Sequence, residues 1–235
     1  DCALKSTSLG GLAALIDMAE SQDHSLQKEC FVSLCAILAS PFEELYQCLY
    51  GVAEQQLRER AENGDESGGD AHVIAKTAIK SAIVSTLDIF DYMDKNSVHA
   101  NMEHIETTKE YLVHTIRNIS CSERGRDILM NVTDPKGKKD RVIRLLNAIR
   151  YIPRGTRNFQ LPASNRRKRK SVVDRENALL EEDAERERQQ LSLCRESADA
   201  LYYLSLHPDG KEMLLYTERV SMESSFAIFV FLFHC

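Results

Sequence analysis

The sequence predicts an all-α protein, and three observations lead to that prediction. Apolar residues recur every three or four positions through most of the 235 residues, which is the spacing that places them on one face of a helix. The longest strand-like stretch is Phe226–Phe233, and no longer alternating pattern indicates β-strands. A hydrophobic content of 43% lets a chain of this length bury a core in one elongated domain or two small ones.

The first 61 residues predict three helices. Apolar periodicity covers residues 12–19 and then residues 26–38. Between these two segments, Ser21 and Asp23 offer side-chain oxygens that can cap the start of the second helix. Pro41 ends that helix because proline lacks a backbone N–H. A third helix is expected to begin near Phe42 and to reach the charged stretch at 58–62.

Residues 62–73 are expected to form an acidic, glycine-rich loop, since ENGDESGGD offers nothing to bury. Helical periodicity returns from Ile74 and continues to Phe90, which gives a stripe of about five turns. Further helices are predicted at 106–120, 125–131 and 138–151. A second helical region therefore spans residues 74–152.

Residues 153–190 differ in character from the rest of the chain. The first part, to Lys170, holds seven basic and no acidic side chains, and two prolines interrupt it. The second part, 171–190, is acidic and suits a solvated helix. We expect a charged, disordered insert over 153–190 and a packed element, truncated within its repeat, over 191–235. The stretch Phe226–Phe233 falls far short of the roughly 20 residues that a membrane-spanning helix needs.

Composition narrows the classes of function. The formal net charge of -6 disfavours a general affinity for nucleic acid or anionic lipid. The seven cysteines show neither the spacing of a zinc site nor the density of a disulfide scaffold, which favours a reducing compartment, the cytoplasm or the nucleus. The chain begins at Asp1 and shows no signal-peptide pattern, so we expect a piece of a longer cytoplasmic or nuclear protein.

Two segments of the chain match each other without gaps. Residues 115–131, TIRNISCSERGRDILMN, align with residues 200–216, ALYYLSLHPDGKEMLLY. The match pairs Gly125 with Gly210 at a polar turn, where the chain must be redirected before a new helix starts. The aligned aliphatic residues are expected to occupy equivalent core positions: Ile116, Ile119, Leu201 and Leu204. Their neighbours Arg117 and Tyr202 are expected to be exposed.

Residues 9–39 read LGGLAALIDMAESQDHSLQKECFVSLCAILA, with a glycine pair before an aliphatic helix, a short Ser/Asp turn and a further helical segment. The residues that carry the pattern are Gly10, Gly11, Leu12, Leu15, Ile16, Asp23, Leu26, Cys30, Leu34 and Ile37. This stretch resembles the armadillo-repeat family: its glycine–glycine–aliphatic opening, its aliphatic third helix, its short turn, and the opening helices of the next repeat. The resemblance implies an all-α, right-handed α-α superhelix with repeats at 1–61, 74–152 and 191–235. In the family, a concave groove binds partner proteins.

The resemblance also suggests which residues would line such a groove. At the positions of the family's asparagine ladder stand Ala36, Asn118 and Tyr203, and the chain has no tryptophan, which disfavours a nuclear-import receptor. The candidate partner contacts are Arg117, Asn118, Tyr202 and Tyr203. Two alternatives stay open: Asn118 braces its own repeat, and the tyrosines pack between repeats.

The densest basic cluster is followed by a candidate phosphosite, Ser171. The cluster consists of Arg166, Arg167, Lys168, Arg169 and Lys170. The cluster can bind in the acidic groove of another protein or can bind phosphate. Phosphorylation of Ser171 would lower the net positive charge of the cluster by close to two units. The alternative is a solvated loop balanced by the acidic run after it.

No residue pattern indicates catalysis, a metal or a cofactor. His99 and His104 would stand roughly 140° apart on a helix, so they would not share a face. We expect a non-enzymatic scaffold or adaptor that binds protein partners, without a small-molecule substrate, nucleic acid or membrane span. Two alternatives are open: a regulatory factor on the same fold, such as a co-chaperone or GTPase exchange factor, and phosphate or nucleic-acid binding through residues 166–170.

Limited trypsin digestion should cut first between Pro153 and Gln190. The basic half of that segment has few apolar side chains to offset the entropy of ordering it. Fragment masses from a time course measure the order of cleavage. Cleavage within 74–150 while 153–190 stays intact would contradict the prediction.

Overall fold

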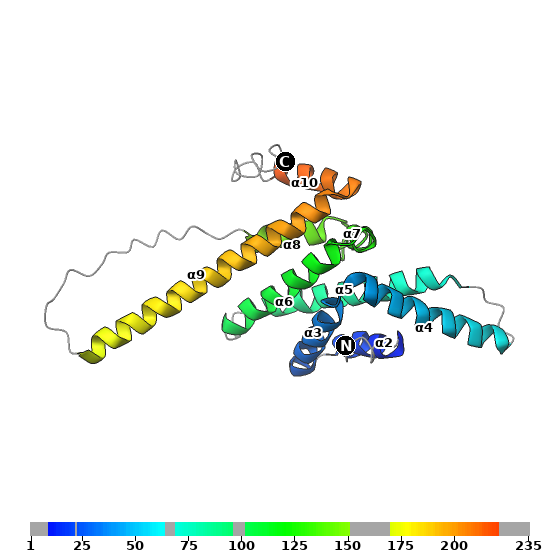
Figure 1. Ribbon diagram of the computed structural model, residues 1–235, viewed down its shortest axis with the longest axis horizontal. Coiled ribbons are helices and arrows are strands. Elements are labelled where there is room, and N and C mark those ends of the chain that lie inside the picture. The colour runs from blue at the N-terminus through cyan, green and yellow to red at the C-terminus, as the bar shows by residue number, and fades with distance from the viewer. Residues whose placement is uncertain (1–8, 22, 64–68, 96–101, 151–169, 221–235) are drawn as a thin grey trace.

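The computed structural model describes residues 9–21, 23–63, 69–95, 102–150 and 170–220. These residues form nine helices and no strand, which confirms the all-α prediction for the described part of the chain (Figure 1). The helices are α2 (Leu9–Ala19), α3 (His24–Leu38), α4 (Phe42–Glu62), α5 (Ala71–Lys95), α6 (Met102–Ser120), α7 (Glu123–Met130), α8 (Arg141–Arg150), α9 (Lys170–Ser205) and α10 (Pro208–Val220).

The helix starts follow the local chemistry of the sequence. The Asp23 carboxylate accepts hydrogen bonds from the backbone N–H groups of Ser25 and Leu26, at 2.9 and 3.3 Å. These N–H groups have no partner within α3, so the cap removes the cost of leaving them unbonded. The α4 helix begins directly after Pro41, as predicted. Ser122 caps α7 in the same way by accepting from the N–H of Gly125.

The α9 helix differs from the predicted insert. Residues 170–190 are the first part of α9, which continues without a break to Ser205, so no boundary falls at 190. The segment contains neither glycine nor proline and is rich in Glu, Arg, Leu and Ala, which favour helices. Residues 151–169, residues 64–68 of the acidic loop and the stretch Phe226–Phe233 lie outside the described residues.

The described helices share one core, and α3, α6 and α9 lie next to one another in that order (Figure 1). Behind them, α5 packs on α2, α3 and α4, and α8 packs on α9. The four aliphatic positions predicted from the internal match are buried in that core: Ile116, Ile119, Leu201 and Leu204. Arg117 lies partly buried beside them, whereas Tyr202 is exposed.

Gly125 and Gly210 have the same structural role in the two matched segments. That role is not the one predicted from the sequence, which placed both glycines in a polar turn. Neither has a positive φ, and each lies in the first turn of a helix rather than in the turn before it. A Cβ on Gly125 would lie 2.0 Å from the carbonyl oxygen of Ile119, and one on Gly210 would lie 2.1 Å from that of Leu204. The glycines are therefore needed because two backbones approach closely.

The serines of the two matched segments are also equivalent. Ser120 Oγ donates to the carbonyl of Arg117 at 2.7 Å, and Ser205 Oγ donates to the carbonyl of Tyr202 at 2.6 Å. Each serine thus adds a hydrogen bond to a carbonyl in the last turn of its helix. The match between 115–131 and 200–216 holds at the level of individual hydrogen bonds.

Charged side chains join helices that are distant in sequence. The buried guanidinium of Arg141, at the start of α8, donates to Asp88 and Asp91 of α5 at 2.7 Å each. Lys76 of α5 pairs with Asp127 of α7. Because one guanidinium is held by two carboxylates, its burial leaves no uncompensated charge.

Cys35 lies in the interface between α3 and α6. Its side chain is buried, and burial raises the pKa of its thiol to about 12. The hydroxyl of Thr115 on α6 donates to the carbonyl of Cys35 at 3.4 Å. The thiol therefore stays protonated and out of contact with solvent while α3 and α6 remain packed.

Replacing Gly125 or Gly210 with alanine should destabilise the protein by roughly 1–3 kcal/mol, because the added methyl group overlaps a backbone carbonyl that cannot move alone. Urea unfolding measures the effect. Gly51, inside α4, is the matched control because nothing lies within 4 Å of its Cβ position. There, alanine should stabilise the protein by about 0.5–1 kcal/mol. Equal effects at the three glycines would contradict this account.

Candidate functional site

The outward side of α3, α6 and α9 forms a continuous surface, which we call the α3–α6–α9 face. The opposite side of each helix is buried in the core, so the remaining side chains point outward together. The face is defined by the exposed residues Val32 and Ala36 of α3, Tyr111, His114 and Cys121 of α6, Ala198 and Tyr202 of α9, and Leu206 directly after α9.

Asn118 connects α6 to α3. Its amide nitrogen donates to the carbonyl of Ala39 at 3.2 Å, directly after the last residue of α3, and lies 3.2 Å from Nε2 of His114. A carbonyl at the end of a helix has no partner within the helix, so this bond satisfies it. Asn118 therefore links α6 to the end of α3, whereas the alternative left open by the sequence was a brace within its own repeat.

An ion pair and a histidine–carboxylate contact connect α6 to α9. Arg117 Nε lies 3.7 Å from Asp199 Oδ2, and His114 Nδ1 lies 3.5 Å from Glu196 Oε2. Each side chain is between a third and one half exposed, so water and salt weaken the attraction. These pairs fix the orientation of α9 on α6 more than they add stability.

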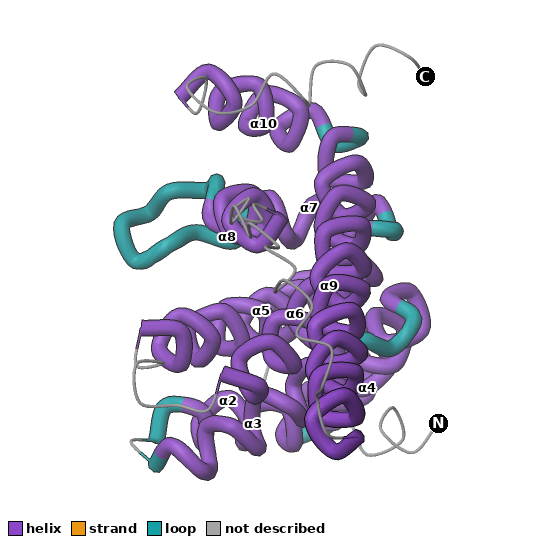
Figure 2. Tube along the Cα trace, turned by 90° about the vertical axis from the view of Figure 1, so that its left-hand side faces the viewer, coloured by secondary structure: helices purple, strands orange, loops and turns teal. Residues whose placement is uncertain are grey.

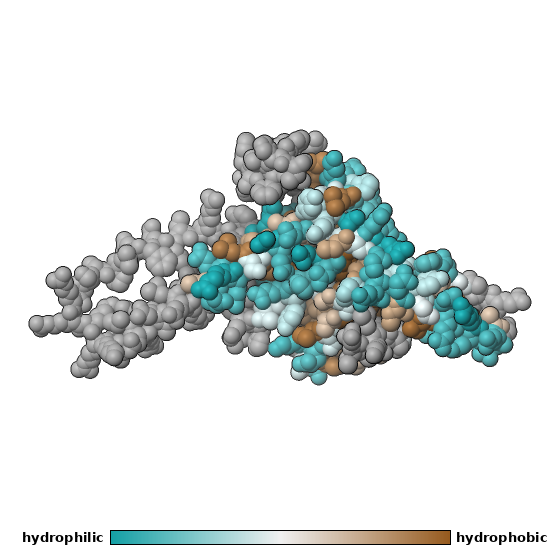
Figure 3. Space-filling view, in the orientation of Figure 1, coloured by the Kyte–Doolittle hydropathy of each residue, from teal (hydrophilic) through white to brown (hydrophobic). Residues whose placement is uncertain are grey.

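Apolar side chains stand between the polar ones on this face. Tyr202 is 54% exposed, and its ring meets that of Tyr203 edge-on at 5.7 Å between centroids. Leu206 is 54% exposed and Tyr111 is 49% exposed. In Figure 3, separate apolar patches interrupt a mostly hydrophilic surface. Large exposed side chains on helices with a packed core are the usual anchors of protein–protein contacts.

The structure places the four residues that the sequence predicted as a site on two adjacent helices, where Tyr202 is exposed and the other three are partly buried. Arg117 and Asn118 lie on α6, and Tyr202 and Tyr203 lie on α9, the helix that packs most closely on α6. Sequence reasoning missed Tyr111, His114 and Leu206. The seven-residue spacing from Tyr111 to Asn118, two helical turns, was a signal that could have found Tyr111.

The other predicted site residues do not join this face. Arg166, Arg167, Lys168 and Arg169 lie outside the described residues, and Lys170 is the first residue of α9. Ser171 follows in the first turn of α9. Nothing in the described structure bears on phosphorylation there.

A closed loop between α7 and α8 was not foreseen from the sequence. The carboxylate of Asp134 accepts from the backbone N–H groups of Lys138 and Lys136, at 2.8 and 2.9 Å, and from the guanidinium of Arg144 at 2.7 Å. Gly137 adopts φ +79, the left-handed region that glycine tolerates best. The backbone N–H of Lys138, together with Arg144 and the N–H of Lys136, lowers the pKa of Asp134.

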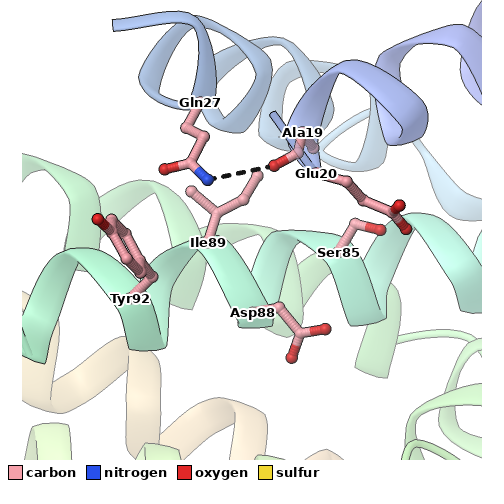
Figure 4. Close-up of a pocket in the computed structure, with 7 residues that line it drawn as sticks. All are labelled: Ala19, Glu20, Gln27, Ser85, Asp88, Ile89 and Tyr92. Carbon is pink, nitrogen blue, oxygen red and sulfur yellow. Dashed lines mark hydrogen bonds between the residues drawn. The ribbon is translucent and has the colours of Figure 1, made fainter. Parts of the chain in front are cut away.

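A cavity of about 260 Å³ lies where α2 and α3 meet α5 (Figure 4). It is lined by Ala19, Glu20, Gln27, Ser85, Asp88, Ile89 and Tyr92. The Gln27 amide donates to the carbonyls of Ala19 and Ser21, at 3.4 and 2.7 Å, so it satisfies the end of α2. None of the four predicted groove residues borders this cavity.

The described residues contain no group of three or more His, Cys, Asp or Glu side chains placed to hold a metal ion. Among these same residues, no helix combines the length and the apolar character needed to cross a bilayer. The arrangement on the α3–α6–α9 face suits binding of another macromolecule.

Comparison of the chain with models of protein families, with curated proteins and with solved structures finds no match.

Replacing Asp134 with asparagine should lower the melting temperature at neutral pH but not in acid. A carboxylate whose folded pKa is lowered stabilises the fold above its unfolded pKa, near 3.9, and loses that contribution as the pH falls toward the folded pKa. The difference in melting temperature between wild type and variant should therefore shrink below about pH 4. A difference that stays constant from neutral to acid pH would show that the charge of Asp134 is not involved.

Proposed function

We propose that this chain is a non-enzymatic protein-binding scaffold or adaptor, and that the α3–α6–α9 face carries its partner contacts. The observation that supports this most is the exposure of Tyr202, at 54%, beside Tyr203 on a helix whose buried side is held by Leu201 and Leu204. A tyrosine presented on a packed helix loses little entropy when it is covered, which favours binding.

We further propose that the helices form an armadillo-like right-handed superhelix. In that arrangement α2–α3, α4–α6 and α7–α9 are successive units, and α10 begins the next. The succession α3, α6, α9 along one side supports it, because each of these helices would be the last of its unit. The shared close approach at Gly125 and Gly210 also supports it, since each glycine would mark the same junction between units.

Replacing Tyr202 with alanine should weaken partner binding by about 30-fold, the effect of losing an aromatic anchor of about 2 kcal/mol. The melting temperature should stay nearly unchanged because the side chain is exposed. Quantitative affinity capture with the wild-type chain and the variant identifies the partners that depend on Tyr202, and titration with a purified partner measures the loss. Tyr216 on α10, 67% exposed, is the matched control. Its replacement with alanine should leave those partners bound.

The same comparison at Arg117, Asn118 and Tyr203 separates binding from bracing. Asn118 is expected to affect stability, because it holds the end of α3. If changes at all four positions lower the melting temperature and leave every captured partner bound, the α3–α6–α9 face is not the binding surface.

A further inference from the structure

Charge is distributed very unevenly along this chain. The 35 residues from 136 to 170 contain thirteen of the 30 basic residues and one of the 36 acidic residues. The remaining 200 residues hold 17 basic and 35 acidic side chains. A protein with a net charge of -6 therefore carries one strongly basic region on an acidic background.

The region begins within the loop 134–139. The two carboxylates that border its lysines, Asp134 and Asp140, are already bonded to the loop backbone or to Arg144. Both oxygens of Asp134 are occupied, by the backbone of the loop and by Arg144. Asp140 lies 3.1 Å from Arg144 as well. Lys136, Lys138 and Lys139 are exposed, and no carboxylate in the described part of the chain pairs with them. Figure 2 shows the loop projecting to the left of α8, while α9 lies to the right.

A fixed loop presents these three charges more effectively than a loose one. Four bonds hold the loop backbone. The Asp134 carboxylate accepts from two N–H groups, the N–H of Gly137 donates to the carbonyl of Asp134 at 2.8 Å, and the N–H of Asp134 donates to the carbonyl of Lys138 at 2.8 Å. A ligand that binds the lysines therefore does not have to order the backbone first. Only the lysine side chains lose freedom.

The charge of the whole molecule decides between possible ligands. At physiological ionic strength, screening limits the range of each charge's electrostatic interaction to about 8 Å. A short ligand bound at the loop therefore interacts mainly with the charges of the loop. A nucleic acid extends over tens of Å and would also meet the acidic remainder of the surface, which repels it. A short anionic segment gains the local attraction without that repulsion.

We propose that the loop 134–139 is a second binding site, which takes a short acidic segment of a partner protein through Lys136, Lys138 and Lys139. This site is separate from the α3–α6–α9 face and does not depend on it. Its ligand is a peptide stretch rich in carboxylate or phosphoserine side chains. The lysine ammonium groups pair with those anions, and Asp134 holds the loop in the binding conformation.

Binding of fluorescent octaglutamate to the full chain tests the proposal. Replacing the three lysines together with alanine should weaken binding about tenfold, as expected for the loss of three exposed charge pairs. The matched control removes the same net charge elsewhere, by replacing Lys28, Lys80 and Lys211 with alanine, and should bind almost as well as wild type. Raising the salt concentration should weaken wild-type binding and narrow its difference from the loop variant.

Three outcomes would overturn the proposal. The first is equal binding of octaglutamate by the wild type and the loop variant. The second is binding of octaglutamine as tightly as octaglutamate, which would exclude charge as the cause. The third is tighter binding of an eight-nucleotide RNA than of octaglutamate, which would assign the loop to nucleic acid. Because the three loop lysines are exposed, circular dichroism should show an intact fold in the loop variant.

Discussion

The close approach of two backbones at Gly125 and Gly210 constrains the rest of the architecture. At each of these points the first turn of a short helix lies directly on a carbonyl of the preceding long helix. The direction of α7 relative to α6, and of α10 relative to α9, follows from this contact. The next helix after α7 is α8, and α9 packs on both α6 and α8. The α3–α6–α9 face therefore depends on a residue that does not belong to it.

The same layout explains which side chains remain available for binding. Between α3 and α6 the polar groups satisfy each other, as Asn118 does with Ala39. Between α6 and α9 the charges of Arg117 and Asp199 are paired. The polar residues of the face thus hold the helices in place, and the tyrosines and Leu206 are left without such a task. Residues available for partner binding and residues that hold the helices together are neighbours on one surface. Stability and partner affinity must therefore be measured together for each variant.

Local features of the sequence predicted much of this fold. Helical periodicity located the helices, and the match between 115–131 and 200–216 identified four buried positions and two equivalent glycines. The reason for the glycines was not predictable, because the clash involves a carbonyl six residues earlier that only the folded chain brings close. The bonds from α6 to α3 join residues 79 and 80 positions apart, and no local pattern encodes them. A solvated helix was expected for 171–190, but its continuation past 190 was not, because the change from charged to apolar composition indicated a boundary there.

The burial of Cys35 makes it an internal reporter of motion. Burial raises the pKa of its thiol to about 12, so the thiol stays protonated at pH 8, and no reagent reaches it while α3 packs on α6. Alkylation at this position must wait for the two helices to separate. The alkylation rate of Cys35 then measures how often the α3–α6 contact opens in the native protein, without denaturant. A partner that spans both helices would lower the alkylation rate of Cys35, even if it never contacts the sulfur.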